Sequence, residues 1–353
     1  MTRHRFAAPS QTRGLSWLSR HRVLGPVVVL ATVSSLAAAS VVVAAQASSR
    51  HPRPHRVAAT HSAARPGAAV AAGAKARPSA GNGICGSRAA GSVRVTHVVW
   101  IVMENRSYNQ VMPAPYISSL AAACGVETNY HNISHPSLPN YLAMTSGRAT
   151  SQLPATDCPS FCPVAGPSIF SQSPSWGVFA ESMPGNCVKH DARPYVVHHT
   201  AAPYYSALTS CPKYDVPLTA LNLSNLPAFS LIIPNIVHDM HERSSSVAAG
   251  DSWLRTNLGA ILNSPVYKSG STVVFVTWDE GGTPRSTNSC ATNTTDQGCH
   301  VALLVMSAFT APGTRWSALA NHYSLLRATE ALLRMPYLGL AASASSVGAA
   351  FRL

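Results

Sequence analysis

The segment from His135 to Gly147, HPSLPNYLAMTSG, places a serine hydroxyl at the start of a predicted helix. Serine is a favoured N-cap residue and a nearby proline suits the first turn, so Ser137 has an ordinary structural role as a helix cap. The free N–H groups of a helix N-terminus also bind anions. Ser137 is therefore a candidate nucleophile toward a bound anion as well as a candidate cap, and the two roles are compatible.

Carboxylate, amide and imidazole side chains follow three apolar runs of the sequence. The runs are residues 95–103 (VTHVVWIVM), 229–233 (FSLII) and 272–277 (TVVFVT). The polar residues that follow them are Glu104 and Asn105, Asp239 and His241, and Asp279 and Glu280. In open α/β sheets ligands bind at the carboxyl ends of the strands, so we expect these side chains to meet at one edge.

Adjacent carboxylate and amide oxygens, with imidazoles nearby, suit a divalent cation. A cation beside a serine at a helix N-terminus is typical of phosphoryl transfer, because it lowers the pKa of the hydroxyl and holds phosphate oxygens. The sequence therefore predicts a metal-assisted phosphoryl-transfer site at this edge.

The elements that must position these residues alternate between strand-like and helix-like patterns. A fourth apolar run, VALLVM, covers residues 301–306. Continuous apolar runs of this length suit strands that are buried on both faces of a parallel sheet. The helix-like patterns lie at residues 116–124, 141–146, 248–262 and 324–333. The prediction is an α/β fold with a doubly wound, mostly parallel sheet and helices on both faces, with long loops over residues 150–215.

The net charge of +13 comes mainly from the first 80 residues, which hold 11 Lys or Arg and no acidic residue. The remaining residues hold 15 Lys or Arg and 13 Asp or Glu, so the predicted folded part is nearly neutral. The charge is therefore no basis for predicting a nucleic-acid partner.

The N-terminal segment has the pattern of an export signal. Five arginines precede an apolar run at residues 24–45, and Ala45-Gln46-Ala47 fits a cleavage site. The run is also about as long as a bilayer span, so residues 1–47 are either a cleaved signal peptide or a retained membrane anchor. Residues 48–83 are predicted to be a disordered basic linker that can associate with a cell wall or membrane, and residues 84–353 to be the catalytic domain. Both alternatives predict a secreted or extracytoplasmic domain.

Eight cysteines follow this segment, and an even number behind an export signal predicts disulfides. Cys158 pairs best with Cys162 and Cys290 with Cys299, because each pair flanks a short loop. Zinc ligation is the alternative, but the paired C-x-x-C spacing of zinc sites is missing.

The motifs together resemble the bacterial phosphoesterase family of secreted acid phosphatases and phospholipases C, within the alkaline-phosphatase-like superfamily, and are most similar to actinobacterial secreted acid phosphatases. The segments that carry the resemblance are HVVWIVMENRSY, SHPSLPNYLAMTSG, FAESMP, YVVHH, PNIVHDMHERSSSVAAGDSWL, VVFVTWDEGG and NHYSLLRATEALL.

The resemblance implies a role for each matching residue. Glu104, Asn105, Asp279 and Glu280 would bind metal, and Ser137 would be the nucleophile. Glu280 stands where many superfamily members have histidine, which favours Ca²⁺, Mg²⁺ or Mn²⁺ somewhat over Zn²⁺. Asn140 would donate its amide to a phosphate oxygen. The remaining matching positions are His199, Asp239, His241 and His322, of which His241 or His199 would protonate the leaving alcohol. His300 has no place in the pattern and either faces the site or begins a strand.

The resemblance implies a metal-dependent phosphatase that acts on phosphate monoesters through a phosphoserine intermediate. A phospholipase C that cleaves phospholipid headgroups is the alternative, so the substrate is a phosphorylated small molecule or a phospholipid. The chain lacks the large C-terminal extension of many such phospholipases, which favours the phosphatase. A non-catalytic surface protein is disfavoured because Ser137 and the metal-binding carboxylates are all present.

Overall fold

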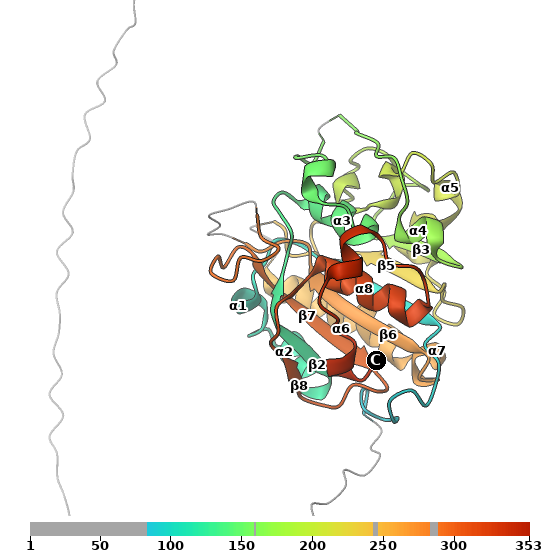
Figure 1. Cartoon of the computed structure of the whole chain (residues 1–353). Coiled ribbons are helices and arrows are strands. Elements are labelled where there is room, and N and C mark those ends of the chain that lie inside the picture. The colour runs from blue at the N-terminus through green and yellow to red at the C-terminus, as the bar shows by residue number, and fades with distance from the viewer. Residues whose placement is uncertain (1–82, 159, 243–245, 283–288) are drawn as a thin grey trace, which may run out of the picture. The chain divides into compact units, whose positions relative to one another are not determined.

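A mixed β-sheet forms the centre of the computed structural model, which describes residues 83–158, 160–242, 246–282 and 289–353 (Figure 1). Its nine strands lie in the order β4-β3-β5-β1-β6-β7-β2-β8, and β9 pairs with β2. The strands are β1 (His97–Met103), β2 (Gly125–His131), β3 (Trp176–Ala180), β4 (Asp215–Pro217), β5 (Phe229–Ile233), β6 (Thr272–Trp278), β7 (His300–Ser307), β8 (Thr314–Trp316) and β9 (Ala320–Asn321).

The strand pairing is parallel except at β7, which runs antiparallel to both β6 and β2. The expectation that VALLVM is a strand is confirmed, but the expectation that it is parallel is wrong. A strand buried on both faces is apolar in either direction, so its composition does not reveal its direction. This reversal brings the first residues of β7 to the edge where β1 and β6 end.

The helices cover the buried faces of this sheet, as predicted. Those described are α1 (Tyr108–Val111), α2 (Pro115–Ala123), α3 (Ser137–Ser146), α4 (Ile169–Gln172), α5 (Cys211–Tyr214), α6 (Val247–Asn263), α7 (Pro265–Lys268) and α8 (His322–Leu333). In Figure 1, α8 crosses the front of the sheet beside α3, which it contacts. Helix α2 contacts α6, and the carboxylate of Asp251 accepts hydrogen bonds from the amides of Tyr116 and Ile117. Strands β1, β5 and β6 are buried almost throughout, which fits helices on both faces.

Four disulfides join the eight cysteines. The expected pairs Cys158–Cys162 and Cys290–Cys299 are confirmed, and the others are Cys85–Cys124 and Cys187–Cys211. Disulfides at this density are typical of extracellular proteins.

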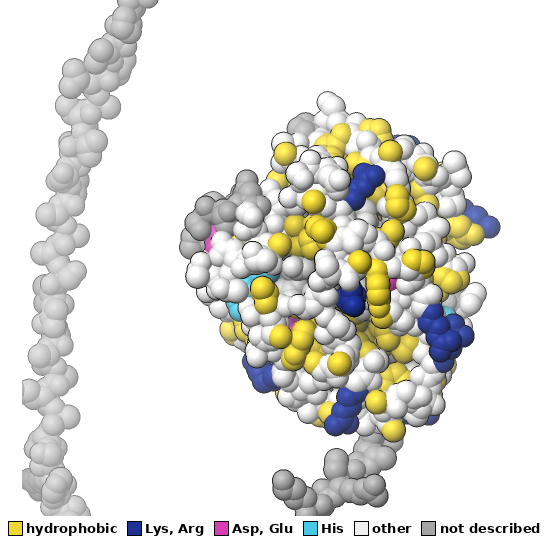
Figure 2. Space-filling model, in the orientation of Figure 1, with side chains coloured by type: hydrophobic (Ala, Val, Ile, Leu, Met, Phe, Trp, Pro, Cys, Tyr) yellow, Lys and Arg dark blue, Asp and Glu magenta, His cyan; other side chains and the backbone are white. Residues whose placement is uncertain are grey.

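The expected leader and most of the expected linker lie outside the described residues. Over the described ranges, no helix combines the length and the apolar character that a bilayer span requires. On the face drawn in Figure 2, lysine and arginine side chains lie at several separate places rather than together.

Helix α3 ends at Ser146, and its C-cap residue, Gly147, has a φ of 70°. A Cβ at this position would overlap the carbonyl oxygen of Leu338. We expect Gly147→Ala to lower the free energy of unfolding by roughly 2–3 kcal/mol, because strain at φ adds to a backbone clash. Urea unfolding measures this loss.

Gly91 supplies the matched control, because its φ is 69° and an added Cβ would meet no atom within 4 Å. Gly91→Ala is expected to cost only about 1 kcal/mol, from φ alone. Equal losses in the two variants would contradict the close approach of Gly147 to Leu338.

Candidate active site

The hydroxyl of Ser137 points at the carboxylate of Glu104, the first residue after β1. Ser137 Oγ donates a hydrogen bond of 3.1 Å to Glu104 Oε2, and the hydroxyl of Tyr141 donates to Oε1 of the same carboxylate. Tyr141 lies one turn after Ser137 on α3, so the helix presents both hydroxyls on the same face. All three residues are buried.

Ser137 does not cap α3, so this part of the expectation is wrong. The helix begins at Ser137 itself, after Pro136. The amide of Leu138 donates to Asp157 Oδ1 at 2.9 Å, so the carboxylate comes from a distant loop. The hydroxyl of Ser137 is thereby left to contact Glu104.

Asp279 lies beside Glu104 because β1 and β6 are parallel neighbours that end at the same edge. The amide of Asp279 donates to the carbonyl oxygen of Met103 at 2.9 Å, and the amide of Asn105 donates to Asp279 Oδ1 at 3.2 Å. Asn105 has a φ of 49°, which turns the chain sharply after Glu104. Among the described residues, Asn105 Oδ1 and Asp279 Oδ2 are buried oxygens without a hydrogen-bond partner.

His199, Asp239 and His241 lie on the other side of Glu104. His199 Nε2 lies 3.5 Å from Glu104 Oε2, and its Nδ1 lies 3.2 Å from Asp239 Oδ2. The amide of His241 donates to Asp239 Oδ1 at 2.7 Å. Nitrogen and oxygen atoms of Glu104, His199 and His241 all lie within 4.8 Å of one another, so these three residues are an alternative ligand set for a metal ion.

Burial shifts the pKa values of these groups toward their neutral forms. It raises the pKa of Glu104 well above its ordinary value, and the nearby carboxylates of Asp279 and Asp239 raise it further. Burial and the charge of Glu280 raise the pKa of Asp279, and burial raises the pKa of Asp239 to about 7. Burial lowers the pKa of His199 well below its ordinary value. These buried carboxylates have little positive charge near them. A bound cation would supply that charge and favour their ionised forms, so the group is suited to bind a metal ion.

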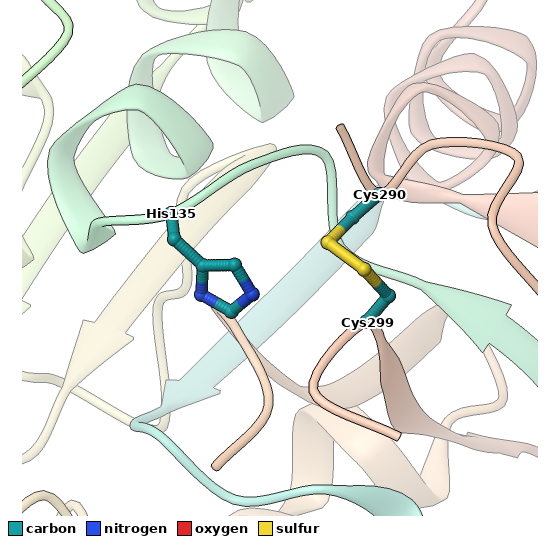
Figure 3. Close-up of side chains that lie close together, drawn as sticks. All are labelled: His135, Cys290 and Cys299. Carbon is teal, nitrogen blue, oxygen red and sulfur yellow. A yellow bond between two sulfur atoms is a disulfide. The ribbon is translucent and has the colours of Figure 1, made fainter. Parts of the chain in front are cut away.

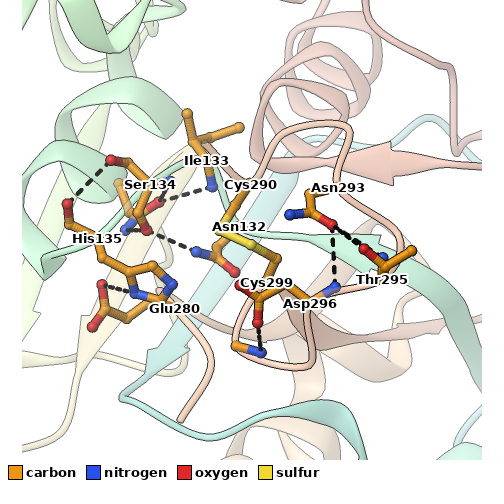
Figure 4. The surroundings of a disulfide bond; sticks show 12 residues. Asn132, Ile133, Ser134, His135, Glu280, Cys290, Asn293, Thr295, Asp296 and Cys299 are labelled. Atoms are coloured by element: carbon orange, nitrogen blue, oxygen red, sulfur yellow. Dashed lines mark hydrogen bonds and ion pairs between the residues drawn. A yellow bond between two sulfur atoms is a disulfide. The ribbon is translucent and has the colours of Figure 1, made fainter. Parts of the chain in front are cut away.

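Glu280 turns to the loop that precedes α3. His135 Nδ1 lies 2.9 Å from Glu280 Oε2, and both side chains are almost fully buried. Figure 4 shows this pair beside the Cys290–Cys299 disulfide. Although His135, Cys290 and Cys299 lie close together, the two sulfur atoms are bonded to each other and supply no thiolate to a metal (Figure 3).

The sequence model of the phosphoesterase family matches residues 112–336, which include α3 and the end of β6. The chain belongs to the phosphoesterase family. It is therefore a hydrolase of phosphoric esters. Glu104 and Asn105 lie just before the matched range, so their place in the site rests on geometry.

Two relatives and one solved structure illustrate the similarity of this phosphoesterase to known proteins. The phosphatidylinositol-3-phosphatase of Mycobacterium tuberculosis (strain ATCC 25618 / H37Rv) is 32% identical over 264 residues, which cover 71% of this chain and 81% of that protein. An acid phosphatase of Aspergillus fumigatus is 22% identical over 265 residues, covering 68% of this chain and 55% of the relative. The chain thus spans about half the length of the fungal relative.

The solved structure is a protein of the alkaline phosphatase superfamily from Vibrio parahaemolyticus. It superposes with a TM-score of 0.52 at 11% identity, over 78% of this chain and 76% of that one. At this identity the likeness concerns the fold alone, and it confirms the predicted α/β architecture.

Asn140 of this phosphoesterase bonds to the loop that leads into α3. Its Oδ1 accepts hydrogen bonds from the amides of Ile133 and Ser134, and its Nδ2 donates to the carbonyl oxygens of Ser134 and Pro136. Both amide hydrogens are used within the loop that leads into α3. Asn140 therefore holds that loop in place, and its donation to a phosphate oxygen stays a prediction.

His322 lies behind the site. Its Nε2 donates to the carbonyl oxygen of Asp279 at 2.6 Å, and its Nδ1 lies 3.0 Å from the hydroxyl of Tyr130. Burial lowers the pKa of His322 to about 4, so the ring is neutral. This side chain fixes the backbone that carries Asp279.

His300 is the first residue of β7, as the strand interpretation predicts. Its Nε2 lies 3.0 Å from the carbonyl oxygen of Thr128, and its ring stacks on those of Tyr108 and His131.

Sequence reasoning missed Tyr141, Asp157 and the His135–Glu280 pair. Tyr141 stands four residues after Ser137, a spacing that predicts a shared helix face. His135 stands two residues before Ser137, but its partner is an acid that lies far away in the sequence. No local pattern connects Asp157 to α3, so the sequence held no signal for this contact.

Proposed function

We propose that this chain is a metal-dependent phosphatase that hydrolyses phosphate monoesters through a phosphoserine at Ser137. The observation that carries the proposal is the hydrogen bond from Ser137 Oγ to Glu104 Oε2 within a buried group of carboxylates. The relatives named as acid phosphatase and phosphatidylinositol-3-phosphatase support a monoester as substrate.

Glu104, Asn105 and Asp279 are the residues that would hold the metal ion. Glu280, which follows Asp279 in the sequence, is the fourth candidate ligand. The partnerless oxygens Asn105 Oδ1 and Asp279 Oδ2 fit such an ion, and an oxygen-rich set favours Ca²⁺, Mg²⁺ or Mn²⁺. When bound, the ion would neutralise negative charge on the phosphoryl oxygens and lower the pKa of a nearby hydroxyl.

Ser137 Oγ forms a bond to phosphorus as the bond from phosphorus to the ester oxygen breaks. Glu104 Oε2, which already accepts the hydrogen bond of the hydroxyl, is positioned to receive its proton. The leaving alcohol takes a proton from His241 or His199. Water then attacks phosphorus and gives a proton to the same histidine, the bond from phosphorus to Ser137 Oγ breaks as phosphate leaves, and Glu104 returns the proton to that oxygen.

His199 is fully buried and contacts the carboxylates of both Glu104 and Asp239. His241 is only half-buried, so solvent can reach its side chain more easily. Burial opposes the charged form of His199. The geometry therefore favours His241 as the proton donor and His199 as a residue that positions the two carboxylates.

The pKa shifts predict how stability depends on pH in the metal-free protein. Above about pH 7.5 the unfolded chain has released nearly all of its carboxyl and histidine protons, whereas burial in the folded chain still favours the protonated forms of Glu104 and Asp279, and to a smaller extent that of Asp239. The folded state then binds more protons than the unfolded state, so the free energy of unfolding falls as pH rises from about 7.5 to 8.5. Urea unfolding in chelator measures this slope.

Saturating metal ion should make this slope shallower, because the ion favours the ionised carboxylates in the folded state. Asp215, whose pKa burial raises to about 8, contributes the same downward slope under both conditions. Identical slopes with chelator and with metal ion would argue against a metal site at these carboxylates.

The test of the proposed function compares hydrolysis of p-nitrophenyl phosphate and bis-p-nitrophenyl phosphate by the full chain. Each assay is run with chelator and with added Ca²⁺, Mg²⁺, Mn²⁺ or Zn²⁺. We expect faster cleavage of the monoester, lost in chelator and restored by a metal ion. Preference for the diester would support a phospholipase C activity on lipid headgroups instead.

We also propose that the protein is exported by its N-terminal segment. The four disulfides support an oxidising compartment. N-terminal sequencing of the protein from culture medium and from membranes distinguishes cleavage after Ala47 from retention as an anchor. Retention of the N-terminal segment in the membrane fraction would favour association with a membrane or cell wall.

A further inference from the structure

A cavity of about 400 Å³ lies next to the nucleophile helix, between the loop that carries the Cys158–Cys162 disulfide and the segment that leads to His199. Its lining includes Asp157, Phe161, Lys189, Asp191, Val197 and His198. We propose that this cavity, here called the alcohol pocket, holds the alcohol part of the phosphate ester and selects a hydroxyl-rich ring. This inference rests on the proposed phosphatase function and names its substrate class.

Two residues connect the alcohol pocket to the site. Asp157, which lines the pocket, accepts a hydrogen bond from the amide of Leu138, the residue that follows the nucleophile. His198, which also lines the pocket, packs edge-on against His199 with ring centroids 4.6 Å apart. His199 in turn contacts the carboxylate of Glu104.

The short 3₁₀ helix Val197–His199 therefore has one imidazole at the site and the next at the pocket. An ester whose phosphorus lies at Ser137 must place its alcohol within a few bonds of that atom. Asp157 and His198 join the alcohol pocket to the residues that adjoin Ser137 and Glu104, and the pocket's volume lies in the range of small-molecule sites.

The lining of the pocket combines apolar surface with both hydrogen-bond donors and acceptors. Phe161 and Val197 supply the apolar surface, and Lys189 Nζ lies 5.6 Å from the centroid of the Phe161 ring. This cation–π contact places the ammonium group over the face of the Phe161 ring. An ammonium group has three donors.

The carboxylate of Asp191 supplies acceptors on the same lining. Its Oδ1 accepts a hydrogen bond from the amide of Val197 at 3.0 Å, which fixes the position of the side chain. A carboxylate has about four acceptor sites, so ligand hydroxyls can donate to it as well.

A six-membered ring with several hydroxyls has the complementary chemistry. Its C–H groups contact apolar surface such as that of Phe161 and Val197, and its hydroxyls both donate and accept hydrogen bonds. Such a ring can belong to a soluble sugar phosphate or to the headgroup of a phosphoinositide. An alkyl or purely aromatic alcohol would leave Lys189 and Asp191 without ligand partners.

The test compares glucose 6-phosphate with cyclohexylmethyl phosphate, which presents a six-membered ring on the same kind of primary ester but without hydroxyls. Wild-type full-length protein should hydrolyse the sugar ester with a kcat/KM about tenfold higher or more, the size of effect that one or two hydrogen bonds give. Phosphatidylinositol 3-phosphate in phosphatidylcholine vesicles is assayed alongside, to distinguish a lipid-borne ring from a soluble one.

Lys189→Gln is the first variant, because Lys189 is exposed and contacts no residue of the site. It should raise KM for glucose 6-phosphate roughly two- to fivefold, the range for an exposed charged contact, with kcat nearly unchanged. Hydrolysis of cyclohexylmethyl phosphate should not change. Asp191→Asn keeps an oxygen for the amide of Val197 and should likewise affect only the sugar ester.

Lys213→Gln is the matched control. Lys213 is also exposed and lies 5.0 Å from the centroid of a tyrosine ring, Tyr214, but it lines a different cavity. Its substitution should leave both substrates unaffected.

Equal effects of Lys189→Gln on the two esters, or no preference of the wild-type protein for the hydroxylated ring, would overturn the alcohol pocket while leaving the phosphatase proposal intact. Hydrolysis of neither ester with any metal ion, in a folded protein, would overturn the proposed function and the pocket with it.

Discussion

Replacing Ser137 by alanine is expected to lower kcat/KM for p-nitrophenyl phosphate by at least about 10⁴-fold, because the change removes the only atom that forms the bond to phosphorus. The fold should be retained, since α3 begins after Pro136 and takes its N-terminal carboxylate from Asp157 rather than from Ser137. Steady-state kinetics measures the loss, and circular dichroism measures the retained fold.

Ser146→Ala is the control for this variant. Ser146 lies at the other end of the same helix, is equally buried and donates its hydroxyl to the carbonyl oxygen of Leu142. It contacts no residue of the site, so its loss should change kcat/KM by less than about twofold. Activity of Ser137→Ala within tenfold of wild type would show that another group attacks phosphorus.

Glu104→Gln should reduce both metal affinity and catalysis. The change keeps one acceptor oxygen, for the hydroxyl of either Ser137 or Tyr141, and it removes the negative charge that a cation needs. We expect kcat/KM to fall by roughly 10³-fold, comparable to the loss of one preorganised electrostatic group. Calorimetric titration of the full chain with Mn²⁺ or Ca²⁺ should show weaker binding.

Glu330→Gln provides the comparison, because Glu330 is another fully buried glutamate whose pKa burial raises, to about 7. It bonds to Gln172 and to the amide of Leu338, away from the nucleophile. Its substitution should leave metal affinity and kcat/KM nearly unchanged. If both glutamate variants lost activity equally, the loss would come from destabilising the fold at a buried carboxyl group and not from removing a metal ligand at Glu104.

The parts of the fold that the sequence predicted well are those in which a single residue pattern determines the outcome. The runs that became β1, β5 and β6 are apolar throughout because both faces of the sheet are covered, and their ends set the edge where Glu104 and Asp279 meet. Strand β2 was missed because polar residues interrupt it, at the point where its register to β7 shifts between Glu127 and Tyr130.

The parts of the site that the sequence could not predict depend on contacts between distant segments. The Leu138 amide could have faced a ligand, but the structure pairs it with Asp157 from the irregular region between residues 150 and 215. The side-chain amide of Asn140 donates to the carbonyl oxygens of Ser134 and Pro136, in the loop before α3, which its place in the sequence did not reveal. Residue type shows which bonds a side chain can make, and tertiary structure decides which of them it makes.

The most direct test of the central claim is to trap the phosphorylated enzyme. Wild-type protein, loaded with the metal ion that supports activity, is mixed with p-nitrophenyl phosphate, quenched in acid within one turnover and digested for mass spectrometry. The account predicts one phosphoryl group on the peptide that contains Ser137, located on that serine and lost when turnover is allowed to finish. A phosphoryl group on another residue, or none on an enzyme that is turning over, would contradict it.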